Sequence, residues 1–187
     1  GIACLPDRVG EFQEGVGQAI DYATALGCKQ INCLAGLTPD GVDPQKVQST
    51  FVSNLRFAAD KLAEAGIRLL IEPINTRDIP GFYLSGTQQA LDIIGATGSD
   101  NIALQYDIYH MQIMEGDLAP TIEANLARIE HMQLADNPGR HEPGTGEINY
   151  PFLFDFIDGL GYQGWIGCEY KPAAKTVDGL GWIKPYL

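Results

Sequence analysis

The sequence predicts a parallel α/β fold, and two observations support this prediction. Strand-like segments alternate with helix-like segments along the whole chain of 187 residues, an order typical of βαβ units and a parallel sheet. Apolar residues make up 45% of the chain and charged residues 19%, a composition typical of globular proteins. A chain of this length can bury a sizeable core.

Apolar residues at helical spacing define the predicted helices. In residues 7–27, Val9, Phe12 and Val16 recur three and four residues apart, and Gly27 ends the pattern. Asn149 is of a type that caps a helix start. The other helices are predicted at residues 44–65, 87–96, 117–127, 149–161 and 176–187.

Short apolar runs between these helices define the predicted strands, at residues 30–35, 67–72, 102–107, 129–135 and 165–169. Two parallel architectures fit this order. One is an open, doubly wound sheet, and the other is a (β/α) barrel, which needs eight units and ~250 residues. Five units are too few to close a barrel, so the pattern alone leaves both architectures open.

Charge and composition exclude several classes of function. Twelve basic and 24 acidic residues give a formal charge of −12, which argues against binding to nucleic acid or to anionic membranes. The chain has no apolar stretch of ~18 residues and no signal peptide pattern, so we expect a cytoplasmic protein. We expect its cysteines to be reduced and mostly buried; they are Cys4, Cys28, Cys33 and Cys168.

Oxygen-bearing side chains stand at the carboxyl ends of four predicted strands: Glu72, Asp107, Gln133 and Glu169. The active site of parallel α/β folds lies at that end of the sheet. Carboxylates that converge there repel one another, and a metal ion is the simplest way to neutralise them. Three carboxylates and an amide are hard donors, which favours Mg²⁺ or Mn²⁺ over zinc.

Three further residues are candidates for substrate binding. His110 follows Asp107 by three residues, and Asp78 lies in the loop after Glu72. Arg140, in the long loop after the fourth strand, is a candidate anchor for a substrate carboxylate. The motifs GxSxG, HExxH and GxGxxG do not occur, which argues against a serine hydrolase, a zincin and a dinucleotide-binding enzyme.

The chain resembles the hydroxypyruvate isomerase family of xylose-isomerase-like TIM barrels. The resemblance is carried by the segments IEPINTRDIPGFYL, LQYDIYHMQIMEGD, HMQLADNPGRHEPGTGEINYPFLFDFIDGLGYQGW and GCEYKP. It implies that the metal ligands are Glu72, Asp107, Gln133 and Glu169, and that Glu72 and Glu169 are also catalytic. It further implies that His110, Arg140 and Asp78 contact the substrate.

The resemblance also implies a partial (β/α)8 TIM barrel, in which the predicted strands correspond to the fourth to eighth strands. We therefore expect residues 1–187 to form a single domain that lacks the N-terminal units of the barrel.

The activity implied by the resemblance is that of an intramolecular oxidoreductase, which interconverts hydroxypyruvate and tartronate semialdehyde with Mg²⁺ or Mn²⁺. Alternatives are a 2-oxo-tetronate isomerase, a ketose 3-epimerase, and a non-catalytic protein that binds a sugar acid or a metal. An apurinic endonuclease is disfavoured by three histidines and the charge of −12. We expect a small hydroxy-oxo acid or sugar acid as the substrate, and copies of the chain that can form a homo-oligomer.

Overall fold

The computed structural model describes all 187 residues, which form two compact units. The first unit is Gly1–Gln105 and the second is Tyr106–Leu187. The boundary falls inside one strand, β3 (Ile102–Asp107). The single-domain organisation stays a prediction.

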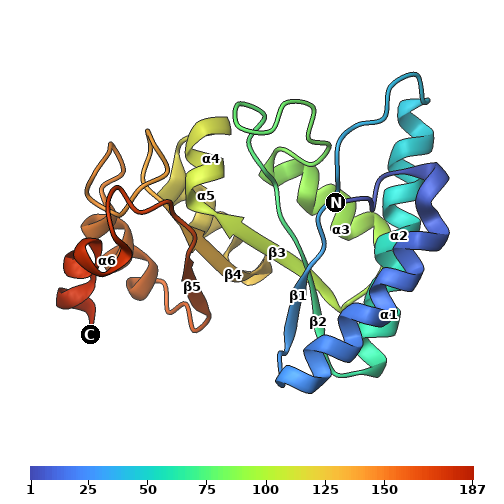
Figure 1. Cartoon of the computed structure of the whole chain (residues 1–187), viewed down its shortest axis with the longest axis horizontal. Helices are drawn as coiled ribbons and strands as arrows, with labels where there is room; N and C mark the ends of the chain where they lie inside the picture. Colours follow the sequence, from blue (N-terminus) through green and yellow to red (C-terminus); the bar gives the residue numbers. More distant parts are fainter. The chain divides into compact units, whose positions relative to one another are not determined.

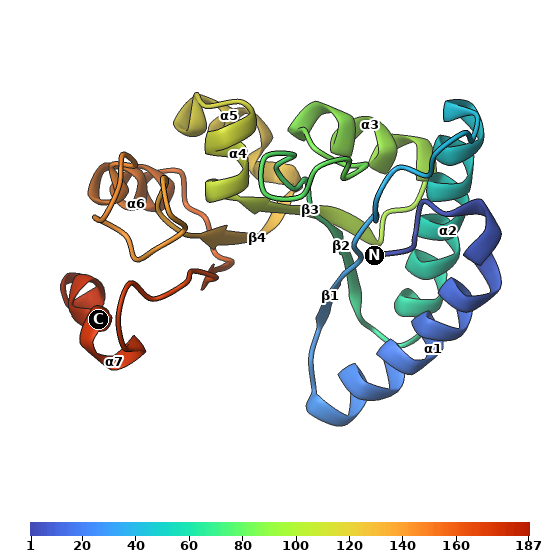
Figure 2. The same cartoon turned by 45° about the horizontal axis from the view of Figure 1, so that its top comes forward.

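The first unit consists of parallel strands and the helices that follow them (Figure 1). Strand β1 pairs with β2, and β2 pairs with β3, in both cases in parallel. The elements in chain order are η1 (Pro6–Arg8), α1 (Val9–Leu26), β1 (Gln30–Asn32), α2 (Pro44–Glu64), β2 (Arg68–Ile71), α3 (Thr87–Thr97) and β3. Helices α1 and α2 lie side by side (Figure 2).

Local chemistry fixes the ends of these two helices. Helix α1 ends at Gly27, whose φ of 67° is a left-handed conformation that costs glycine little. Helix α2 begins after Asp43, whose side chain accepts a hydrogen bond from the backbone N–H of Gln45 at 2.9 Å. Pro44 occupies the first helical position, where the missing N–H has no partner to lose.

The second unit carries two strands, β4 (Ile129–Leu134) and β5 (Trp165–Cys168), which pair in parallel. The remaining elements are α4 (Ile108–Met114), α5 (Leu118–Asn125), η2 (Leu126–Arg128), α6 (Tyr150–Gly159), α7 (Thr176–Gly179) and η3 (Leu180–Tyr186). The side chain of Asn149 accepts a hydrogen bond from the N–H of Phe152 at 3.3 Å, so the predicted cap of α6 is confirmed.

The parallel α/β fold predicted from the sequence is confirmed, with two differences in detail. Helix α4 was not predicted; it begins immediately after β3 and has only seven residues, too few to show a clear apolar period. The last predicted helix is a four-residue helix followed by a 3₁₀ segment that contains Pro185.

None of the helices combines the length and the apolar composition that a membrane span requires.

The cysteines are all free, as predicted. The expectation that they are mostly buried is wrong for Cys28 and Cys168, which are exposed. Cys28 lies in the turn after α1, and Cys168 ends β5, a strand whose side chains are exposed or half-buried.

Every residue of β3 is buried, so a large-to-small substitution in this strand tests whether it belongs to the core. The variant Leu104→Ala removes a fully buried side chain and should lower the free energy of unfolding by about 2–5 kcal/mol. Leu26→Ala, at a position 80% exposed on α1, is the control and should change it by less than about 0.5 kcal/mol. Equal urea denaturation midpoints for the two variants would contradict this core.

Candidate functional site

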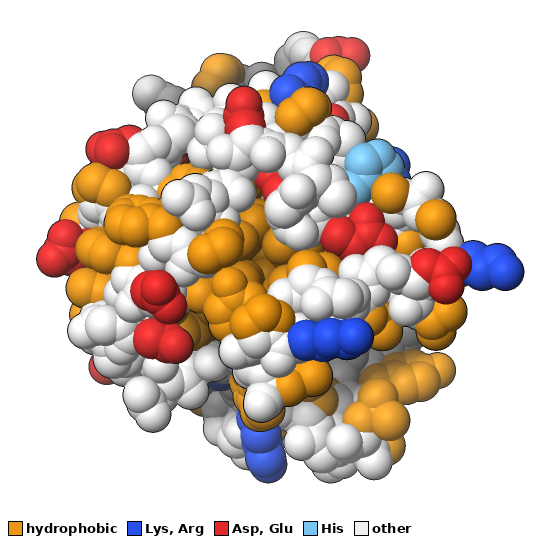
Figure 3. All heavy atoms as spheres, turned by 90° about the vertical axis from the view of Figure 1, so that its left-hand side faces the viewer, with side chains coloured by type: hydrophobic (Ala, Val, Ile, Leu, Met, Phe, Trp, Pro, Cys, Tyr) orange, Lys and Arg blue, Asp and Glu red, His pale blue; other side chains and the backbone are white.

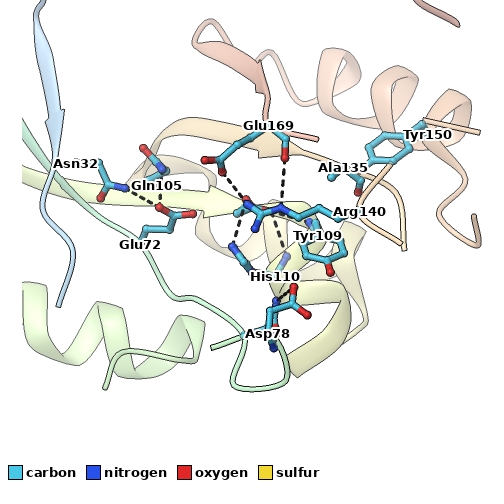
Figure 4. Close-up of polar contacts among 12 residues, drawn as sticks. Asn32, Glu72, Asp78, Gln105, Tyr109, His110, Ala135, Arg140, Tyr150 and Glu169 are labelled. Carbon is cyan, nitrogen blue, oxygen red and sulfur yellow. Dashed lines mark hydrogen bonds and ion pairs between the residues drawn. The ribbon is translucent and has the colours of Figure 1, made fainter. Parts of the chain in front are cut away.

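Glu72 lies in the first unit, directly after β2, and only 4% of it is exposed. Its Oε2 atom accepts a hydrogen bond from Nδ2 of Asn32 at 2.6 Å and another from Nε2 of Gln105 at 2.9 Å (Figure 4). Asn32 ends β1, and Gln105 lies near the end of β3. The carboxyl ends of three parallel strands therefore bring three polar side chains into contact at Oε2 of Glu72.

Asp78 lies in the turn that follows Glu72, and the turn itself holds its side chain. Its backbone N–H donates to Oδ1 of Asn75 at 2.7 Å, and Nδ2 of Asn75 donates to Oδ2 of Asp78 at 3.2 Å. Nε of Arg77 lies 3.8 Å from Oδ1 of Asp78. These contacts brace the turn, and the role of Asp78 in substrate binding stays a prediction.

Asp107 belongs to the second unit, where it ends β3 and caps α4. Its Oδ1 atom accepts hydrogen bonds from the backbone N–H groups of Tyr109 at 2.8 Å and His110 at 3.1 Å. An Asp at the N-cap is a recognised helix-start signal, so Asp107 has a structural role in addition to its predicted role as a metal ligand. The cap turns His110 back toward Asp107, with its Nε2 3.8 Å from Oδ2.

The other carboxylate oxygen of Asp107, Oδ2, is buried and accepts no hydrogen bond. Because burial disfavours the charged form, the pKa of Asp107 is raised to about 6. A buried carboxylate oxygen without a donor is costly, and a bound cation would remove that cost. The donor chemistry of this residue therefore fits a hard divalent ion.

Gln133 is the next-to-last residue of β4 and lies opposite Gly167 of β5. Side chains alternate along a strand, so His131 and Gln133 share one face. A Cβ atom on Gly167 would lie 3.1 Å from Nε2 of His131 and 3.7 Å from Cγ of Gln133. The glycine thus leaves room for both side chains at this face.

Arg140 and Glu169 form an ion pair in the second unit. Nη2 of Arg140 lies 3.1 Å from Oε2 of Glu169, and Nε donates to the backbone oxygen of Glu169 at 3.4 Å (Figure 4). The guanidinium carbon lies 5.3 Å from the centroid of the Tyr109 ring. The structure therefore brings a predicted substrate anchor and a predicted catalytic glutamate into direct contact.

The loop that carries Arg140 is organised by Asp136, a fully buried residue that sequence reasoning did not select. The Asp136 carboxylate accepts hydrogen bonds from the backbone N–H groups of Asn137, Gly144, Gly146 and Ile148, at 2.8–3.1 Å. Its backbone oxygen accepts from the N–H of Arg140 at 3.0 Å. The signal in the sequence was an Asp at the start of a glycine-rich loop, which is typical of a loop that needs an internal acceptor.

The predicted residues are thus distributed over the two units. Glu72 and Asp78 lie in the first unit, whereas Asp107, His110, Gln133, Arg140 and Glu169 lie in the second. A four-ligand metal site that combines Glu72 with the others stays a prediction. Asn32 and Gln105, the partners of Glu72, were missed, although each is a polar residue within an otherwise mostly apolar strand.

A sequence model of the family described as "Xylose isomerase-like TIM barrel" matches residues 3–186. This match confirms the predicted fold class, a partial (β/α)8 TIM barrel. The chain is 56% identical over 186 residues to "Hydroxypyruvate isomerase" of Escherichia coli K12, and the match covers 100% of this chain and 72% of that protein.

Two further relatives match over the same shares of both chains, at lower identity. A protein of Cupriavidus necator named "2-oxo-tetronate isomerase" is 48% identical, with 100% of this chain and 72% of that protein covered. A crystal structure described as "AP endonuclease, family 2" from Brucella melitensis has a TM-score of 0.96 and 44% identity, and again 100% of this chain and 72% of that one are covered.

The raised pKa of Asp107 predicts a pH-dependent effect of Asp107→Asn on the metal-free protein. The folded state holds the Asp107 proton up to about pH 6, whereas the unfolded chain releases it near pH 4. The stability of the unchanged protein therefore falls between these two pH values, stays lower above pH 6 and is unaffected below about pH 4. The variant should therefore be more stable than the unchanged protein by about 1–3 kcal/mol at pH 8 and equally stable at pH 4.

Urea denaturation at both pH values measures this difference. Asp60→Asn, at an exposed position on α2, is the control and should change little at either pH. The same stability change at pH 4 and pH 8 for Asp107→Asn would be inconsistent with an ionised, uncompensated Asp107.

Proposed function

Because this chain belongs to the hydroxypyruvate isomerase family of xylose isomerase-like TIM barrels, we propose that it is a metal-dependent isomerase that interconverts hydroxypyruvate and tartronate semialdehyde. The observation that carries this proposal is the 56% identity to a hydroxypyruvate isomerase over the full chain. Buried acids at the carboxyl ends of parallel strands, Glu72 and Asp107, support it.

The proposed metal ligands are Glu72, Asp107, Gln133 and Glu169, with Mg²⁺ or Mn²⁺ as the ion. Glu72, Asp107 and His110 are buried and carry donor atoms that can hold a cation. Gln105, which donates to Glu72, and Asp107 are two residues apart on β3 and therefore share a face of the strand. When bound, the ion would stabilise negative charge on the substrate oxygens.

The two glutamates would carry the proton transfer. The reaction removes a proton from the hydroxymethyl carbon of hydroxypyruvate and delivers one to the neighbouring carbonyl carbon, through an enediolate. The proton of the original hydroxyl group is transferred to the former carbonyl oxygen. One of Glu72 and Glu169 accepts the first proton, and the other donates the second.

Arg140 would bind the substrate carboxylate, with His110 and Asp78 as further contacts. Its guanidinium already binds a carboxylate, that of Glu169. A substrate acid that engages Arg140 would compete with the Glu169 carboxylate for the guanidinium.

The 48% identity to a 2-oxo-tetronate isomerase supports a second candidate activity on a longer sugar acid. A substrate panel that includes hydroxypyruvate, 2-oxo-tetronates and ketoses such as D-fructose separates these activities by kcat/KM. A non-catalytic binding protein would bind the acid without exchanging its carbon-bound proton in D₂O.

Cleavage of nucleic acid is not favoured. Besides the charge of −12, Figure 3 shows Lys and Arg side chains isolated from one another on the face that it displays. Cytoplasmic location and homo-oligomer formation stay predictions.

Glu72→Gln and Glu169→Gln should each lower kcat for hydroxypyruvate at least ~100-fold, because the amide cannot accept or donate the proton. Circular dichroism should show an unchanged fold. Glu64→Gln, at a surface ion pair with Lys61, is the matched control and should retain turnover. Near-normal turnover and deuterium exchange in both site variants would refute the assigned roles.

Removal of divalent ions should abolish turnover, because the proposed ligands are hard oxygen donors. After dialysis against EDTA, Mg²⁺ or Mn²⁺ should restore activity and raise the melting temperature, since a ligand that binds only the folded state stabilises it. Full turnover in protein that elemental analysis finds free of metal would contradict metal dependence.

A further inference from the structure

The hydrogen bonds to Glu72 single out two amides for which the proposed reaction has no role. We infer that Asn32 and Gln105 are positioning residues that together hold Oε2 of Glu72 and so fix how its carboxylate is presented to the cation and the substrate. This inference rests on the proposed function, in which Glu72 is both a ligand and a proton-transfer group.

Two side chains donate hydrogen bonds to the same oxygen atom of Glu72. Oε2 of Glu72 accepts from Nδ2 of Asn32 at 2.6 Å and from Nε2 of Gln105 at 2.9 Å. The donors come from the strands on either side of β2, since β2 pairs with β1 and with β3. Two donors on opposite sides fix the rotation of the carboxylate group, whereas a single hydrogen bond would leave the group free to rotate.

The side chain of Asn32 has a feature that packing does not explain. Its Oδ1 atom is buried and has no hydrogen-bond partner, whereas its Nδ2 atom donates to Glu72. A buried acceptor without a donor lowers stability, and an apolar side chain of similar size would avoid that loss. The amide is therefore best explained by what its nitrogen does for Glu72.

The donors are also suited to a metal ligand because they are neutral. A Lys or Arg at either position would neutralise Glu72 and repel a divalent cation. The amides of Asn32 and Gln105 orient the carboxylate and leave its charge in place. Outer hydrogen bonds of this kind commonly fix the orientation of a metal-binding side chain.

Titration with Mn²⁺, followed by electron paramagnetic resonance of the free ion, tests the inference without relying on turnover. The variants are Asn32→Leu and Gln105→Met, each made in the unchanged protein and in a Glu72→Gln background. Each should weaken Mn²⁺ binding on the order of 10-fold in the unchanged protein. In the Glu72→Gln background the further loss should be less than about twofold, because the carboxylate that the amides orient is gone.

Asn101→Leu is the matched control, because the Asn101 amide donates only to the backbone oxygens of Ala59 and Ile67, both at 2.9 Å. It should lower the melting temperature without changing the Kd for Mn²⁺. If Asn32→Leu does not fold, Gln105→Met decides the outcome alone.

Unchanged Mn²⁺ affinity in the amide variants, or an equal loss in both backgrounds, would overturn the inference. If Glu72→Gln itself changes neither Mn²⁺ binding nor turnover, the proposed function fails instead, and the two failures are thereby distinguished.

Discussion

The cost of burying carboxylates at the ends of apolar strands is the constraint on which this account depends. Asp107 is fully buried, yet one of its oxygens accepts no hydrogen bond. Glu72 is nearly as buried, and Asn32 and Gln105 donate to it from neutral amides. Such groups are tolerated where a compensating charge binds. The proposed divalent cation would supply that charge, and the proposed reaction would use both acids.

The second unit shows how backbone structure delivers the remaining groups. Asp136 gathers backbone N–H groups of a glycine-rich loop, and the same loop directs Arg140 onto Glu169. Arg140 has a φ of 59°, a conformation that the surrounding hydrogen bonds must maintain. The position of Arg140, the proposed substrate anchor, is thus set by Asp136, a residue to which the proposed reaction gives no role.

Much of the fold could be predicted from the sequence, because apolar spacing and helix-ending glycines are local signals. Strand β3 was predicted at its observed bounds, residues 102–107. Helix α4 was missed because its seven residues carry too little periodicity. The partners of Glu72 were also missed. That Asn32 and Gln105 meet at one oxygen depends on the register of β1 and β3 with β2, and sequence spacing does not encode this register.

Diffraction from crystals grown with Mn²⁺, measured at the manganese absorption edge, tests the proposed metal site. We expect one strong anomalous peak bound by oxygen atoms of Glu72 and Asp107, with Gln133 and Glu169 completing the ligands. A structure without such a peak, in which Glu72 and Glu169 face away from each other with no space for an ion between them, would contradict it.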